Sequence, residues 1–297
     1  MSEFFDKTIF PAFSARLRTK NSVNNYISTI REFNNFTGVS FELANNRQVA
    51  EYDLYLTKLE KNDNKIKAST HATKLSMLKS IADFIENCSL VDNYNNPFKD
   101  IHIERPDIVL YDADVPLLHD LEVLLENAKN NPRDFLIFLL AAKCGLTTGE
   151  LLNLRLKDLI FDENKMVYSI NILKGKRQRN ILIPEDVSLA FQNYLLIFEG
   201  EDRLFLNSRN KPITEKGLQR LIASYMDNLT EQLSGRRMTL ADLRHSAIKY
   251  MKMGGASNTE IAAYIGNEKA YMLSRYDNVS YNNMEKGIKY SVLSINN

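Results

Sequence analysis

The sequence has little cysteine and no long apolar run, and both features narrow the class of protein. Its 297 residues include two cysteines, Cys88 and Cys144, and neither belongs to a CxxC pair. Two cysteines are too few for a disulfide framework, so we expect both to be small buried hydrophobic residues in a reducing compartment. No segment approaches the roughly 18–20 apolar residues that span a bilayer, so we expect no membrane contact. The first residues lack the basic-then-apolar pattern of a signal peptide, so we expect a cytoplasmic protein.

The sequence also has few histidines and a net charge close to zero. The four histidines are His71, His102, His119 and His245, and the net charge is +1. A near-neutral balance neither indicates nor excludes a nucleic-acid partner, because a local basic stripe sets that affinity. The composition, 44% hydrophobic and 25% charged, is that of an ordinary globular protein. The length favours two domains, because single cores seldom grow much beyond about 250–300 residues.

The first hundred residues have the apolar spacing of helices. Between residues 22 and 36, apolar side chains recur at i, i+3, i+4 and i+7, with Ser22 as the expected N-cap and Gly38 as the expected stop. Two more helices are predicted, one that follows the Asn-rich stretch before Val49 and one that runs from about 69 to 85. We therefore expect a helical domain over residues 1–104.

Two lysines lie on the polar side of the third predicted helix. Lys74 and Lys79 belong to a solvated helix face in one interpretation. In the other they neutralise phosphates of a DNA backbone laid against the helix. Both interpretations stay open at this point.

The remainder of the chain predicts a second, mainly α domain with a small β unit. Residues 105–112 have the turn-rich look of a linker, and the second domain covers 113–297. Within it, periodic helices are expected at 115–127 and 134–143. Strands are expected at 166–173 and 180–183, joined by the basic turn 174–179. Helices then resume near Val187 and continue to the end, with breaks at Gly235, Gly254–Gly255 and Gly266.

Several motifs stand in a fixed order in this second domain. They are Gly145-Leu146-Thr147-Thr148-Gly149-Glu150-Leu151, the basic hairpin turn, Ala241-Asp242-Leu243-Arg244-His245, and Ser274-Arg275-Tyr276-Asp277 with Asn267 nine residues before Tyr276. This order and these gaps resemble the tyrosine recombinases, the phage-integrase and Xer family that cuts and rejoins DNA. The resemblance extends over nearly the whole chain. It implies a helical core-binding domain followed by a catalytic-type domain.

The resemblance also implies a chemistry. Tyr276 would attack a DNA phosphodiester and form a 3′-phosphotyrosyl link, which conserves the bond energy without ATP or a metal cofactor. Arg244 matches the second of two arginines that neutralise the phosphate, and Lys174 on the hairpin matches a general acid. Lys176 is the alternative candidate for this lysine. With Arg177, Lys176 is also an expected DNA contact, although turn residues of this kind are often merely solvated.

Three positions depart from the family pattern. Thr147 stands where the first arginine is expected, Ala241 where a histidine is expected, and Asn267 where histidine or tryptophan is usual. Removing one donor that stabilises developing charge typically costs roughly a hundred- to a thousandfold in rate. Lys143 reaches the face of Thr147 only if one helix runs unbroken through Gly145.

The leading hypothesis is a DNA-binding member of this family with an impaired active site, acting as an architectural or regulatory subunit. The alternative is an active recombinase that activates the phosphate with unusual residues, Lys143 among them. A helical protein-interaction module without DNA is the third interpretation, and it leaves the ordered motifs unexplained. The expected partner is double-stranded DNA. The amphipathic C-terminal run after Tyr276, with Ile288, Tyr290, Val292, Leu293 and Ile295, predicts a homo- or hetero-oligomer on that DNA. Intramolecular packing of this run is the other possibility.

Overall fold

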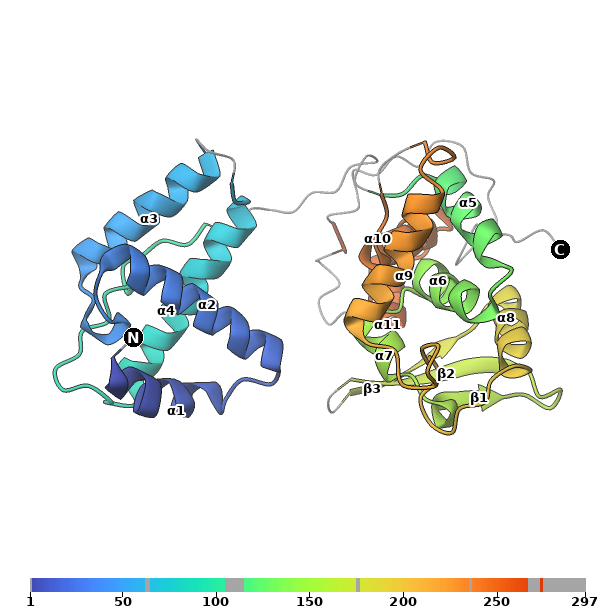
Figure 1. Cartoon of the computed structure of the whole chain (residues 1–297), viewed down its shortest axis with the longest axis horizontal. Helices are drawn as coiled ribbons and strands as arrows, with labels where there is room; N and C mark the ends of the chain where they lie inside the picture. The colour runs from blue at the N-terminus through green and yellow to red at the C-terminus, as the bar shows by residue number, and fades with distance from the viewer. Residues whose placement is uncertain are drawn as a thin grey trace. The chain divides into compact units, whose positions relative to one another are not determined.

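The computed structural model describes residues 2–61, 65–104, 115–174, 177–234, 237–266 and 273–274, with only the backbone for Lys174 and Arg177. Its internal contacts divide the chain into two units, residues 1–107 and 108–297 (Figure 1). Each unit has its own hydrophobic core.

The first unit is helical throughout its regular elements. These are the π-helix η1 (Phe5–Ile9), α1 (Phe10–Ser14), α2 (Lys20–Thr37), the 3-10 helix η2 (Phe41–Leu43), α3 (Asn46–Lys61) and α4 (Ala68–Asn87). Helices α2, α3 and α4 pack against one another. The three predicted helices are therefore confirmed. The N-cap prediction was wrong, because Thr19 caps α2 by accepting from the backbone N–H of Ser22, while Gly38 ends the helix at φ 72° as expected.

Aromatic rings fill the core of this unit. Phe33 contacts Phe41, Tyr52 and Phe98, with ring centroids 5.6, 5.1 and 5.7 Å apart. All four side chains are fully buried. Contacts of this kind add about 0.5–1.5 kcal/mol each to the area that the rings bury.

The second unit combines helices with one small sheet. Its elements are α5 (Leu118–Ala128), α6 (Pro132–Cys144), α7 (Thr148–Asn153), the 3-10 helix η4 (Leu156–Asp158), β1 (Leu159–Phe161), β2 (Val167–Lys174), β3 (Arg177–Leu182), α8 (Glu185–Leu195), α9 (Glu215–Asn228), α10 (Leu240–Met253) and α11 (Asn258–Ile265). The fold predicted from the sequence, mainly α with a small sheet, is confirmed.

Helix α6 runs through the middle of this unit (Figure 1). Its residues from Leu136 to Ala142 are all buried, as expected for a helix that is apolar on every side. It packs against α5, α8 and α10. The helix ends at Cys144 and is capped by Gly145, which takes the left-handed φ of 64° that glycine adopts without strain.

The sheet is antiparallel with strand order β1-β2-β3. Sequence reasoning missed β1, and it began the last strand at residue 180, whereas β3 begins at Arg177. The stretch expected as a six-residue turn therefore lies largely in the strands, and Ile172 is paired with Arg179. The predicted return to helix near Val187 is confirmed by α8, but residues 196–214 then form turns and isolated bridges before α9.

The cysteine prediction was correct for one residue of the two. Cys144 is buried, and burial raises the pKa of its thiol to about 12. Cys88 is exposed at the C-terminal end of α4, so its expected burial was wrong. Within the described parts of the chain, no helix has the length and apolar character needed to cross a membrane.

Candidate functional site

The turn between α6 and α7 positions Thr147 and Glu150. Thr147 is the N-cap of α7, and its Oγ1 accepts a hydrogen bond from the backbone N–H of Glu150 at 3.3 Å. In return, Glu150 Oε2 accepts from the backbone N–H of Thr147 at 2.9 Å. This capping box satisfies two N–H groups that the start of a helix leaves without partners. The side chain at position 147 therefore serves as a helix cap.

Arg244 reaches this turn from the second turn of α10. Its Nη1 donates to the carbonyl of Gly145, and its Nη2 donates to the carbonyl of Ile265 at 3.1 Å. Glu150 Oε2 lies 3.9 Å from Nη1, and the Arg244 side chain is 19% exposed. The guanidinium is thus fixed among the end of α6, the start of α7 and the end of α11.

A second guanidinium, that of Arg179, comes to the same carboxylate from strand β3. Its Nη1 lies 2.8 Å from Glu150 Oε1, and its Nε donates to the carbonyl of Tyr264 at 3.0 Å. The side chain is 15% exposed. Sequence reasoning placed Arg179 in a turn and assigned it no role. The missed signal was the alternation of the strand, because Ile181 is buried and a residue two positions before it faces the same way.

Glu150 therefore lies between two arginines. Burial by itself would raise the pKa of its carboxyl, but the hydrogen bonds from Arg179 and Thr147 and the positive charge of Arg179 together lower it. The carboxylate is consequently ionised at neutral pH. Two guanidiniums and one carboxylate leave this cluster with a net charge of about +1.

Gly266 allows the Arg179 guanidinium to lie against the backbone at the end of α11. It adopts φ +70°, and a Cβ built there would stand 2.4 Å from Arg179 Nη1 and 2.7 Å from Cζ. No side chain fits in that space unless the guanidinium moves. The predicted helix break at Gly266 is confirmed, and this close approach adds a second reason for glycine there.

Ala241 lies in the first turn of α10, which Thr239 and Asp242 cap reciprocally. It is three residues before Arg244, so both project from the same side of the helix. Ala241 is exposed and presents only a methyl group. Position 241 itself therefore supplies neither a proton nor a hydrogen-bond donor.

The structure overturns Lys143 as the missing cation. Helix α6 ends at Cys144, and the left-handed Gly145 turns the chain before Thr147, so the two side chains do not share a helix face. The Lys143 ammonium forms an ion pair with Asp186 in the first turn of α8, and its side chain is 5% exposed. Lys143 is thus a buried structural cation.

The other predicted residues of this unit lie at the hairpin and near the end of the chain. Lys174 ends β2 and is paired in register with Arg177, the first residue of β3. Lys176, Asn267, Tyr276 and the C-terminal run lie outside the described residues. Their predicted roles stay predictions.

The two candidate lysines of α4 have different surroundings. Lys74 Nζ donates to both carboxylate oxygens of Glu32, at 2.5 and 2.6 Å, and its side chain is 18% exposed. Lys79 Nζ donates to the carbonyl of Lys99 at 2.9 Å, in an exposed position. Of the two, Lys79 has the charge that is more open to an external anion.

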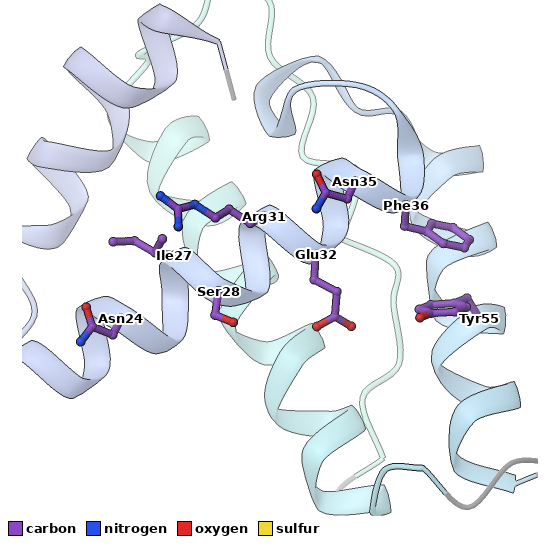
Figure 2. Close-up of a pocket in the computed structure, with 8 residues that line it drawn as sticks. All are labelled: Asn24, Ile27, Ser28, Arg31, Glu32, Asn35, Phe36 and Tyr55. Carbon is purple, nitrogen blue, oxygen red and sulfur yellow. The ribbon is translucent and has the colours of Figure 1, made fainter.

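Concave surfaces lined by polar residues occur in both units. In the first unit, a pocket of about 840 Å³ lies between α2 and α3 and is lined by Asn24, Ile27, Ser28, Arg31, Glu32, Asn35, Phe36 and Tyr55. Figure 2 shows the Phe36 and Tyr55 rings face to face at one side, with their centroids 4.6 Å apart. In the second unit, a pocket of about 500 Å³ lies beside the Glu150 turn, and its basic lining residues are Arg155, Lys157 and Arg203. Among the described residues, no group of three or more His, Cys, Asp or Glu side chains is arranged to hold a metal ion.

Comparison with known proteins places these features in a family. The model of the phage integrase family matches residues 117–283, more than half of the chain. A tyrosine recombinase of Pseudothermotoga lettingae is 32% identical over 141 residues, which cover 48% of this chain and 47% of that protein. The tyrosine recombinase XerC of Staphylococcus aureus is 23% identical over 279 residues, which cover 90% of this chain and 89% of that protein. The chain thus spans about half the length of the first relative and nearly all of the second.

Solved structures with the same fold give a consistent result. The Tn1549 transposon integrase in complex with transposon right end DNA has a TM-score of 0.69 and 15% identity, over 92% of this chain and 93% of that chain. A lambda integrase dimer bound to a COC′ core site has a TM-score of 0.68 and 16% identity, over 92% of this chain and 75% of that chain. At such identities the likeness concerns the fold.

Proposed function

Because the chain belongs to the phage integrase family of tyrosine recombinases, the family involved in site-specific recombination, we propose that it binds double-stranded DNA and takes part in such recombination. In this proposal Arg244 holds the phosphate at the exchange point and Tyr276 stands at the nucleophile position. A hydroxyl attack on phosphorus transfers the 3′ phosphate to the tyrosine and releases a 5′ hydroxyl, so that the same bond can be remade with another strand.

The observation that carries the proposal is the fixed guanidinium of Arg244. It is anchored by two backbone carbonyls and held beside Glu150, so little reorganisation is needed when an anion arrives. The cluster retains net positive charge after Glu150 is counted. Planar guanidinium donors match the oxygens of a phosphate better than an ammonium does.

Further support comes from basic residues elsewhere in the chain. The basic lining of the pocket beside Glu150 and the hairpin residues Lys174, Lys176 and Arg177 suit a phosphate backbone. In the first unit, Lys79 and the exposed Arg31 of α2 are cations of the same kind. The proposal extends to assembly on DNA, as a homo- or hetero-oligomer through the C-terminal run, which lies outside the described residues.

Two roles are compatible with this function, and a different observation favours each. The cap formed by Thr147 and the bare methyl of Ala241 favour a DNA-binding subunit that does not cut. The second guanidinium at Glu150 favours a subunit that cuts and rejoins strands. The chemistry at Tyr276 distinguishes them.

The experiment begins with duplexes that the protein selects from a random-sequence pool. Binding to them is measured at several salt concentrations, because phosphate contacts make affinity fall steeply as salt rises. Nicked versions of the selected duplexes are then incubated with wild type and with Tyr276→Phe, and covalent protein–DNA adducts are separated under denaturing conditions. Tyr276→Phe retains the ring and removes only the nucleophilic hydroxyl.

We expect salt-sensitive binding by both proteins. An adduct that wild type forms and Tyr276→Phe does not identifies the cutting role. Salt-sensitive binding without an adduct identifies the non-cutting role. Absence of salt-sensitive binding refutes the proposed function.

A further inference from the structure

We infer that Arg179 of strand β3 is the second phosphate-binding cation of this site and replaces the arginine that position 147 lacks. The inference rests on the proposed function, because it assumes that a DNA phosphate enters the cluster. Under this inference the guanidiniums of Arg179 and Arg244, which lie on either side of Glu150, together bind one phosphate.

The two arginines share their anchoring. Each donates to a backbone carbonyl at the end of α11, Arg179 to Tyr264 and Arg244 to Ile265. Each is paired with a different oxygen of Glu150. Although the two residues are 65 positions apart in the chain, neighbouring carbonyls and one carboxylate fix both guanidiniums in the same place.

Arg179 also has an unused donor. Among the described residues, its Nη2 is buried and has no hydrogen-bond partner. A charged N–H group in that condition is costly unless it gains a partner in another state of the protein. A phosphate oxygen supplies such a partner, and its negative charge matches the net charge of the cluster.

Glu150 links the position that lacks an arginine with the arginine that the strand provides. Thr147 is used as the cap of α7, and Glu150 completes the capping box with one carboxylate oxygen. The other oxygen accepts from Arg179. Gly266 leaves the space that this guanidinium occupies. The second cation is therefore placed beside the turn where position 147 would otherwise supply it.

A purely structural role is the competing explanation. Arg179 would then only neutralise Glu150 and satisfy the last carbonyls of α11, as basic residues often do at helix C-termini. In that case removal of Arg179 would change the stability of the fold. It would not change how strongly DNA affinity depends on the charge of any one phosphate. The two explanations therefore differ in a quantity that can be measured.

The test is a binding cycle between Arg179 and single phosphates. The probes are selected duplexes in which one phosphate at a time near the centre of the site is replaced by an uncharged methylphosphonate. Wild type, Arg179→Gln and Arg209→Gln are compared, the last removing an equal charge from an exposed turn residue. Binding is measured whether or not the protein cuts, and melting curves check that each variant is folded.

We expect one methylphosphonate position to weaken wild-type binding about tenfold or more, the contribution of a charge-assisted hydrogen bond. At that position Arg179→Gln should lose less than about threefold, and Arg209→Gln should behave as wild type. Adding Thr147→Arg to Arg179→Gln should restore the tenfold sensitivity, which a merely structural role of Arg179 would not predict. If Arg179→Gln is unfolded because Glu150 is left unpaired, Glu150→Gln with Arg179→Gln removes both charges and serves in its place.

Equal sensitivity of wild type and Arg179→Gln at every position would overturn the inference. So would salt-sensitive binding by wild type that no single methylphosphonate weakens, although DNA binding itself would stand. Absence of salt-sensitive binding refutes the proposed function and the inference together. The two failures are thus distinguishable.

Discussion

Gly266→Ala tests whether the backbone at the end of α11 holds Arg179 in place. Alanine at φ +70° costs about 1–2 kcal/mol in a left-handed conformation. The new Cβ also collides with the end of a flexible side chain, so Arg179 moves and loses its bonds to Glu150 and Tyr264. A hydrogen bond that involves a charged group contributes about 1.5–3 kcal/mol, and the partial exposure of Arg179 favours the lower end. We expect a total loss of about 3–5 kcal/mol.

Gly255→Ala is the matched control in the same unit. Gly255 has φ +87°, and a Cβ placed on it would meet no heavy atom within 4 Å, so alanine there carries the backbone strain alone. At roughly 2–4 °C per kcal/mol for a unit of this size, the control should lower the melting temperature by about 4 °C and Gly266→Ala by about 10 °C. Scanning calorimetry of the full chain measures both shifts.

Repeating the pair in an Arg179→Ala background isolates the contact. The excess cost of Gly266→Ala should then vanish, because the atoms that its Cβ would meet are gone. Equal melting shifts for the two glycine variants in the wild-type background would refute the claim that Gly266 makes room for Arg179.

Two further predictions concern buried charge. The pKa of Glu150 lies below its ordinary value near 4.5, so its contribution to stability is complete above that value and is lost as pH falls through the folded pKa. Denaturant titrations between about pH 3 and 6 should therefore show that the free energy of unfolding falls less steeply with acid in Glu150→Gln than in wild type. Identical slopes of unfolding free energy against pH would contradict this. Lys143→Met should lower the free energy of unfolding in urea by about 2–3 kcal/mol, because it leaves the Asp186 carboxylate without its ion-pair partner. Adding Asp186→Asn should recover much of that loss. A double variant that is no more stable than Lys143→Met alone would argue against a coupled pair.

The helices were predictable because their signals are local. Apolar periodicity located α2, α4 and α6, and Gly38 and Gly266 marked helix ends through their backbone freedom. The cap at Thr19 was missed because Ser22, three residues later, is an equally good capping residue by type. Strand β1 was missed because its three residues are too few to show alternation.

The site was only partly predictable, because its parts come from four separate segments. The box around Glu150 and the motif around Arg244 were recognisable in the sequence, and the structure brings their side chains to within 3.9 Å. Arg179 was treated as part of a polar turn, since a run of basic residues around Gly175 is typical of one. Lys143 was misjudged for the opposite reason, because sequence proximity to Thr147 said nothing of the turn at Gly145 that separates them.

The placement of the second cation at Arg179 on β3, and not at position 147, affects the start of helix α7. An N-cap threonine typically stabilises a helix start by about 0.5–2 kcal/mol, and an arginine side chain cannot accept the N–H hydrogen bond that this requires. With the second cation on β3, position 147 is available to cap α7, and the capping box in turn fixes the carboxylate that receives Arg179. Thr147→Arg in an otherwise wild-type chain should therefore weaken α7 while adding a third guanidinium around one carboxylate. Threonine at position 147 and arginine at position 179 are thus coupled, because the helix cap, the Glu150 carboxylate and the strand arginine depend on one another.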